Sequence, residues 1–194
     1  VSRLVGADIR YYGLLEDRGW TPDFDALEHA DLSGVKIMWT NYPNMPTGAP
    51  ASRELFERLV DFGRRHNILI INDNPYSFIL NDNPLSILSV PDAKDIAIEM
   101  NSLSKSHNMA GWRMGMLAAK AEYVAWIRRV KSNVDSGQFA PMMSAVTDAL
   151  AVGDEWYAQL NATYAERRAI VDRIATALGC TFDPAQRGMF VWAR

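Results

Sequence analysis

The sequence predicts an α/β fold in which helices flank a mostly parallel sheet, giving three layers. The main observation is an alternation of short β-rich runs with a segment of helical periodicity. Runs rich in apolar and β-branched residues occupy 35–43 and 67–76, and a helical pattern occupies 52–66 between them. This order is a βαβ unit, whose two strands run in parallel.

The helix expected at 52–66 has the features of a helix that covers one face of a sheet. Leu55, Leu59 and Phe62 recur at helical spacing and form one apolar face. Glu54 lies in the first turn and the last turn is basic, which suits the helix dipole. We therefore expect this segment to pack against the sheet along its apolar side.

The rest of the chain continues the alternation and then becomes helical. We expect a third strand within 95–105, a fourth within 111–119, helices at 122–134, 142–152 and 155–179, and short strands at 180–184 and 188–194. The last two strands follow a long helix and could open a second domain. We therefore assign residues 1–152 to a large domain and residues 153–194 to the start of a smaller α+β domain.

Composition indicates a globular protein. The 194 residues are 48% hydrophobic and 22% charged, which is enough to build a core. The net charge is −3 and the basic residues form no block, so neither nucleic acid nor an acidic membrane surface is an expected partner. No apolar run approaches the ~18 residues that cross a bilayer.

Cysteine usage and the chain ends add two expectations. Cys180 is the only cysteine, so no disulfide and no multi-cysteine metal site can form within one chain. We expect no bound metal and a reducing, cytoplasmic setting. The chain lacks an initiating methionine and ends at 188–194 in an apolar run without a closing loop, so we expect a fragment of a longer protein.

Polar side chains gather where the expected strands end. Asp73 and Tyr76 follow the second strand, and Ser102, Ser104 and Lys105 follow the third. Because the carboxyl ends of parallel strands lie at one edge of a sheet, these residues would line one crevice. Each alone has a simpler interpretation, since lysines are usually surface residues and aspartate beside asparagine and proline favours a turn. The functional argument depends on the set.

The spacing of these residues resembles a known signature. In NSLSKSHNMAGWRMG, at 101–115, a serine lies three residues before Lys105, and Arg113 lies eight residues after it. With DNPY at 73–76 and NYPNMPTG at 41–48, this stretch resembles the class I/II aminotransferases, which are fold-type I pyridoxal-phosphate-dependent enzymes. The motifs occur in the family's order, and the resemblance runs along nearly the whole chain.

The resemblance implies a role for each polar residue at the strand ends. Lys105 would be the catalytic residue and would bind the aldehyde of pyridoxal 5'-phosphate as an aldimine. Asp73 would face the ring nitrogen and keep it protonated, because a nearby carboxylate raises the pKa of that nitrogen. Tyr76 would donate a hydrogen bond to the phenolic oxygen of the ring. The phosphate would be bound by Arg113, Ser102 and Ser104.

Two features depart from the family. The asparagine that directly precedes Pro-Thr-Gly in the family donates to the ring oxygen, but this chain has Met45 there and Asn44 one residue earlier. A thioether cannot donate a hydrogen bond, so Asn44 in an altered turn, Tyr76 alone, or another side chain would have to bind that oxygen. Family members are also considerably longer, with a glycine-rich phosphate loop upstream and a carboxylate-binding arginine downstream that this chain lacks.

The resemblance implies amino-group transfer from an amino acid to a 2-oxo acid, with Lys105 moving a proton from Cα to the C4′ carbon of the cofactor. Carbon–sulfur lyases and cyclopropane-forming (ACC-synthase-like) synthases share the same residues and stay open, as does a non-catalytic fragment that retains no cofactor. The family also implies a homodimer. The mostly apolar stretch at 132–146, which contains Phe139 and Met142, is the expected interface.

Overall fold

A computed structural model describes residues 2–194, and the chain divides into two compact units at Val35 and Lys36. The first unit is small. Its elements are η1 (Ser2–Val5), β1 (Leu14–Leu15), η2 (Glu16–Arg18), β2 (Thr21–Pro22) and α1 (Phe24–His29). Strands β1 and β2 pair in antiparallel, and the carboxylate of Asp23 caps α1 by accepting from the backbone N–H of Ala26 at 3.1 Å.

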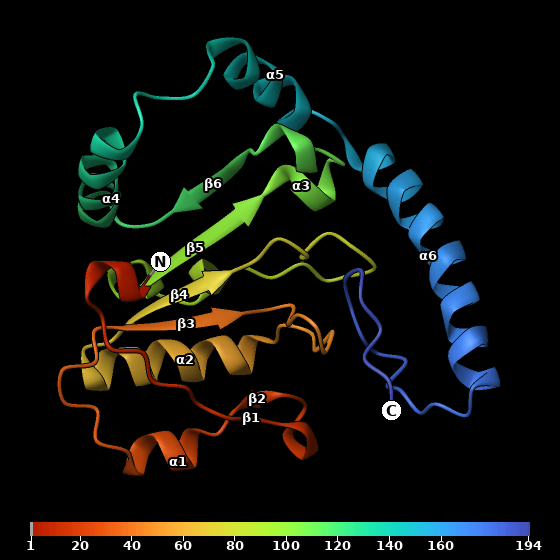
Figure 1. Cartoon of the computed structure of the whole chain (residues 1–194), viewed down its shortest axis with the longest axis horizontal. Coiled ribbons are helices and arrows are strands. Elements are labelled where there is room, and N and C mark those ends of the chain that lie inside the picture. Colours follow the sequence, from red (N-terminus) through yellow and green to blue (C-terminus); the bar gives the residue numbers. More distant parts are fainter. Residues whose placement is uncertain (1) are drawn as a thin grey trace. The chain divides into compact units, whose positions relative to one another are not determined.

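The second unit is built on a four-stranded sheet. Its strands are β3 (Ile37–Asn41), β4 (Leu69–Asp73), β5 (Ala97–Ser102) and β6 (Gly115–Ala118), and they lie side by side in that order (Figure 1). Strands β3, β4 and β5 are parallel, and β6 runs antiparallel to β5. The predicted α/β class with a mostly parallel sheet is therefore confirmed.

Helices account for most of the remaining chain. They are α2 (Arg53–His66), α3 (Leu103–Ser106), α4 (Ala121–Val134), α5 (Ala140–Leu150) and α6 (Asp154–Ala177), with 3-10 turns η3 (Ile87–Ser89), η4 (Ala93–Asp95) and η5 (Ala110–Trp112). The four long helices agree with the sequence prediction to within two residues at each end. The boundary expected between residues 152 and 153 stays a prediction, because the second unit extends from Lys36 through α6 to the chain end.

The two strands expected at the chain end do not form. A single bridge between Phe182 and Ala193 is the only β-pairing there among the described residues. The backbone N–H groups of Arg187 and Gly188 donate instead to the carbonyls of Gly48 and Ile79, at 2.7 and 2.9 Å. Beside the bridge, Thr181 and Arg194 exchange two backbone hydrogen bonds at 2.7 and 2.9 Å, so the pairing between the two segments is confined to their outer ends.

Helix α2 packs as the sequence predicts, with Leu55, Leu59 and Phe62 buried. The hydroxyl of Ser52 caps its start by accepting from the N–H of Leu55 at 3.0 Å, and such a cap stabilises a helix by about 1 kcal/mol. Asn67 ends the helix in the left-handed conformation, with φ of 53°. The position of α2 fixes where the chain enters β4.

Gly63 marks the closest approach of α2 to the sheet. A Cβ atom at this position would lie 2.7 Å from the carbonyl oxygen of Ile68 and 2.9 Å from Cγ1 of Ile70. Both distances are shorter than van der Waals contact, and the carbonyl belongs to the backbone. The helix can lie this close to the sheet only without a side chain at residue 63.

We predict that Gly63→Ala destabilises the protein by about 1–3 kcal/mol, measured by urea unfolding, because overpacking a tight contact forces backbone to move. In an exposed helix interior the same change stabilises by roughly 1 kcal/mol, so the sign itself is informative. Glu57→Ala, at an exposed position of α2, is the control and should change stability by less than about 0.5 kcal/mol. A stabilising Gly63→Ala would contradict this packing.

Candidate active site

Three parallel strands end at the same edge of the sheet. Asn41, the last residue of β3, pairs with Asp73, the last residue of β4, and Asp73 pairs with Met100 of β5. Ser102 ends β5 two residues later. The polar residues that follow these strands are therefore brought to one edge, as the convergence expected from the sequence requires.

The turn after β3 uses Asn44 for its own structure. The side-chain carbonyl of Asn44 accepts from the hydroxyl of Thr47 at 2.7 Å, and its amide donates to the carbonyl of Asn41 at 3.1 Å. Its backbone N–H and carbonyl bond to Ala49 and Gly48, each at 2.8 Å. Asn44 is buried, and both ends of its amide are engaged within the turn.

Met45 faces the aromatic residue that follows β4. The hydroxyl of Tyr76 donates to the sulfur of Met45 at 3.1 Å, although 46% of the Met45 side chain remains exposed. The backbone N–H of Met45 donates to Oδ1 of Asn41 at 2.7 Å, and Nδ2 of Asn41 donates to the carbonyl of Asp73 at 2.7 Å. Asn41 thus ties the turn after β3 to the end of β4.

Asp73 and Tyr76 each have a shifted pKa. The Asp73 side chain is open to solvent on one side, but partial desolvation raises the pKa of its carboxyl. Burial raises the pKa of the Tyr76 hydroxyl, and the negative charge of Asp73 raises it further. Within residues 2–194, no donor or cation bonds to the carboxylate oxygens of Asp73.

Residues at the chain end contact Tyr76, which the sequence did not predict. The ring of Phe190 meets Tyr76 edge-on, with centroids 5.7 Å apart. A Cβ atom at Gly188 would lie 3.4 Å from Cβ of Tyr76, so the backbone passes close to that ring. In the sequence, only Gly188 at the start of an apolar run indicates a close backbone approach. The sequence cannot show which aromatic side chain that backbone approaches.

Lys105 lies on α3, directly after β5. The hydroxyl oxygen of Ser102 caps this short helix by accepting from the N–H of Ser104 at 3.1 Å. Leu103 and Ser106 are buried and anchor the helix, while Lys105 is only partly covered. No hydrogen bond or ion pair of the Lys105 ammonium occurs within the part of the chain that the structure describes.

The chain then returns to the end of β5, so that Arg113 lies two residues before the ladder partner of Ser102. Ser102 pairs with Gly115 in the β5–β6 ladder, and the N–H of Leu103 donates to the carbonyl of Met114 at 3.2 Å. Arg113 adopts the left-handed conformation, with φ of 56°, and its guanidinium donates to the carbonyl of Ala110 at 3.0 Å. Lys105 and Arg113 therefore both lie within the connection between the paired residues Ser102 and Gly115.

The assembled groups are chemically complementary to an anionic, electrophilic ligand. One edge of the sheet carries an amine, a guanidinium and hydroxyls after β5, and a carboxylate and a phenol after β4. An uncharged amine attacks carbonyl carbons, and guanidinium and hydroxyl groups bind phosphate oxygens. Among residues 2–194 there is no cluster of three metal-ligating side chains, and no helix is long and apolar enough to span a membrane.

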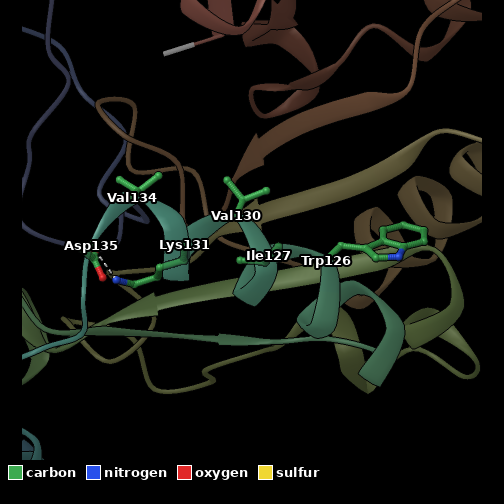
Figure 2. Close-up of a pocket in the computed structure, with 6 residues that line it drawn as sticks. All are labelled: Trp126, Ile127, Val130, Lys131, Val134 and Asp135. Carbon is green, nitrogen blue, oxygen red and sulfur yellow. Dashed lines mark hydrogen bonds and ion pairs between the residues drawn. The ribbon is translucent and has the colours of Figure 1, made fainter.

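A separate apolar groove lies along α4. Figure 2 shows Trp126, Ile127, Val130 and Val134 along this helix, with Lys131 and Asp135 beside them. The two charged side chains form an ion pair with each other at 2.6 Å. No other titratable group from the described residues lines this groove, so it is not the candidate active site.

Comparison with known proteins agrees with the geometry. The family model described as aminotransferase class I and II matches residues 1–194. LL-diaminopimelate aminotransferase from Oleidesulfovibrio alaskensis is 39% identical over 196 residues, and the enzyme of that name from Aquifex aeolicus is 39% identical over 183 residues. These matches cover 100% and 93% of this chain, but 50% and 47% of those proteins. The chain therefore spans about half the length of the curated relatives it matches.

Solved structures show the same fold. The apo structure of BacF from Bacillus subtilis matches with a TM-score of 0.93 and 31% identity, over 99% of this chain and 49% of that one. A probable N-succinyldiaminopimelate aminotransferase from Thermus thermophilus matches with a TM-score of 0.91 and 30% identity, over 100% of this chain and 52% of that one.

We predict that Asp73→Asn raises the melting temperature of the ligand-free protein modestly at pH 7. The folded-state pKa of Asp73 is raised, so its charged form costs stability at every pH above the unfolded value of about 4. The gain should vanish below that pH, where both states are protonated. Thermal unfolding between pH 3 and 8 measures this, with the exposed Asp82→Asn as control. Lower stability at pH 7 would assign Asp73 a purely structural role in the turn.

Proposed function

Because this chain belongs to the class I and II aminotransferase family, we propose that the whole protein transfers an amino group between an amino acid and a 2-oxo acid. Pyridoxal 5'-phosphate is the proposed cofactor. The observation that carries the proposal is the closed connection from Ser102 to Gly115, which holds Lys105 and Arg113 at the same strand end. Asp73, which ends the neighbouring strand β4, and Tyr76, which follows it, add a carboxylate and a phenol at the same edge of the sheet.

The chemistry of the side chains fits this cofactor. The guanidinium of Arg113 and the hydroxyls of Ser102 and Ser104 suit a phosphate dianion. The carboxylate of Asp73 suits the protonated ring nitrogen, since it has no other cationic partner among the described residues. When bound, the cofactor supplies an electron sink for the negative charge that develops at the substrate Cα.

Lys105 has two tasks in this proposal. Its Nζ atom would hold the cofactor, which requires the amine to be free of competing partners. With substrate bound, Nζ would accept the proton from the substrate Cα as a general base and deliver it as a general acid. Partial exposure of Lys105 leaves room for its side chain to reach both positions.

Tyr76 is the proposed donor to the phenolic oxygen of the ring. Its hydroxyl is bonded to the sulfur of Met45, and because sulfur is a weak acceptor, releasing this bond costs little. Asn44 stays a prediction as a second donor, because its amide would first have to leave Thr47 and Asn41. Met45 thus occupies the family's asparagine position and contacts the same tyrosine.

The names of the relatives bear on the substrate class, and the cysteine count bears on the cellular setting. The relatives named above act on diaminopimelate by name, so this compound belongs in a substrate panel with common amino acids. Release of ammonia from a substrate in that panel would favour the carbon–sulfur lyase alternative. Formation of a cyclopropane product would favour the synthase alternative. Both alternatives use the same residues. The single cysteine supports a reducing, cytoplasmic setting as part of the proposal.

We predict that borohydride reduction of the whole protein with pyridoxal 5'-phosphate, followed by peptide mapping, labels Lys105. Lys94, Lys120 and Lys131 serve as internal controls and should stay unlabelled, because none follows a strand end with phosphate-binding side chains. Label on any of these three would refute the assignment. An absorbance spectrum of residues 1–194 with the cofactor tests separately whether this part of the protein binds it alone.

We also propose a homodimer whose interface includes the stretch between α4 and α5. Helices α4 and α5 bury none of their side chains within the part of the chain that the structure describes. Phe139 and Met143 are 69% and 50% exposed, which is unusual for large apolar residues close together. An isologous contact between two copies would cover this surface, as in most symmetric dimers.

For this dimer we predict that Phe139→Asp shifts the whole protein toward monomer in sedimentation velocity. A charge buried at an interface without a partner costs several kcal/mol, so dissociation should be complete at micromolar concentration. Glu122→Lys, on an exposed position of α4, changes charge without adding one to the apolar stretch and should leave the dimer intact. A wild-type protein that is a fully active monomer would rule the proposal out.

A further inference from the structure

We propose that His107 is a positioning residue that couples helix α6 to Lys105, an inference that rests on the proposed role of Lys105. Lys105 lies in α3, a helix of only four residues. A single helical turn is not stable by itself, because fixing its backbone costs more than its few hydrogen bonds return. The orientation of Lys105 therefore depends on contacts from outside α3.

Two consecutive residues of α6 supply such contacts. The hydroxyl of Ser106 lies 2.8 Å from Nδ1 of His107, and Nε2 of the same ring lies 3.4 Å from the hydroxyl of Tyr157. Trp156 donates from its indole Nε1 to the backbone carbonyl of Ser106 at 2.9 Å. Ser106 and His107 are buried, so water does not replace these bonds easily. The first turn of α6 thus holds the end of α3 directly after Lys105.

The same part of α6 also holds the segment that follows Tyr76. The ring of Tyr157 stacks on Phe78 with centroids 5.2 Å apart. Asn161, one turn further along α6, accepts from the N–H of Leu80 at 2.7 Å and donates to the carbonyl of Phe78 at 3.0 Å. Helix α6 is therefore bonded to the loops after β4 and after β5. A displacement of α6 would act on both sides of the candidate site.

The surroundings of His107 suit a neutral ring. It faces the hydroxyls of Ser106 and Tyr157 and the backbone of Ala149 at the end of α5, and the nearby charge is that of Asp154, which acts on Tyr157. Burial lowers the pKa of His107, opposed in part by the Ala149 carbonyl. A neutral imidazole offers one acceptor and one donor, and the hydroxyls of Ser106 and Tyr157 and the carbonyl of Ala149 can satisfy both in either tautomer.

His107→Phe tests the coupling, because phenylalanine keeps the ring volume and removes both nitrogens. We expect amide hydrogen exchange in residues 103–106 to accelerate by about tenfold while α2 and β4 keep their rates. The Kd of the whole protein for pyridoxal 5'-phosphate should rise by about tenfold, as expected for the loss of one or two hydrogen bonds. His107→Asn, whose amide offers both a donor and an acceptor to Ser106, should restore most of both losses.

Two further variants keep the test decisive. Tyr157→Phe removes only the longer hydrogen bond and should give a smaller change in the same direction. Ser106→Ala replaces His107→Phe if the latter fails to fold. Exchange rates and Kd within about twofold of wild type would overturn the proposal, as would equal acceleration in α2, which would make His107 a packing residue. If the wild-type protein binds no cofactor, the proposed function fails, but the exchange measurement still decides the coupling.

Discussion

The architecture of the candidate site depends on one closure, the pairing of Ser102 with Gly115 at the open end of the β5–β6 ladder. This pairing forces the intervening residues into a short loop whose two ends touch. A Cβ atom at Gly115 would lie 2.8 Å from the carbonyl of Asn101, so the strands can approach this closely only with glycine there. The closure keeps Lys105 and Arg113, which are eight residues apart, within one connection that begins and ends at the Ser102–Gly115 pair.

The neighbouring parallel strands β3 and β4 bring further polar residues to the same edge of the sheet. Because Asn41 and Asp73 share a register, the side chain of Asn41 can bond to the turn after its own strand and to the end of the next. The carboxylate of Asp73 is held where partial burial disfavours its charge. A partly desolvated carboxylate that has no cationic partner among the described residues is a candidate functional group.

Helix α6 connects the two halves of the site from outside the sheet. Its first turns contact the loop that carries Lys105 and the segment after Tyr76, through Trp156, Tyr157 and Asn161. Fold-level similarity to aminotransferases says nothing about these contacts. They link the segment around the lysine to residues after 152, where the sequence predicts that a second domain begins.

Local patterns in the sequence determined the βαβ unit, the ends of the long helices and the residues at the strand ends. The apolar face of α2 and its capping serine are encoded within a few residues, so periodicity reveals them. The spacing of Lys105 and Arg113 is also visible in the sequence, because both residues lie in one short connection between two strands. Resemblance to a known family then supplied roles that spacing alone could not assign.

Only the tertiary structure decided contacts between residues far apart in the chain. It turned the amide of Asn44 into its own loop, brought Phe190 against Tyr76, and joined His107 to Tyr157 fifty residues away. It also limited the pairing within 180–194 to one bridge beside the two hydrogen bonds between Thr181 and Arg194. These contacts depend on which distant residues the fold brings together, and a pattern along the sequence does not contain that information.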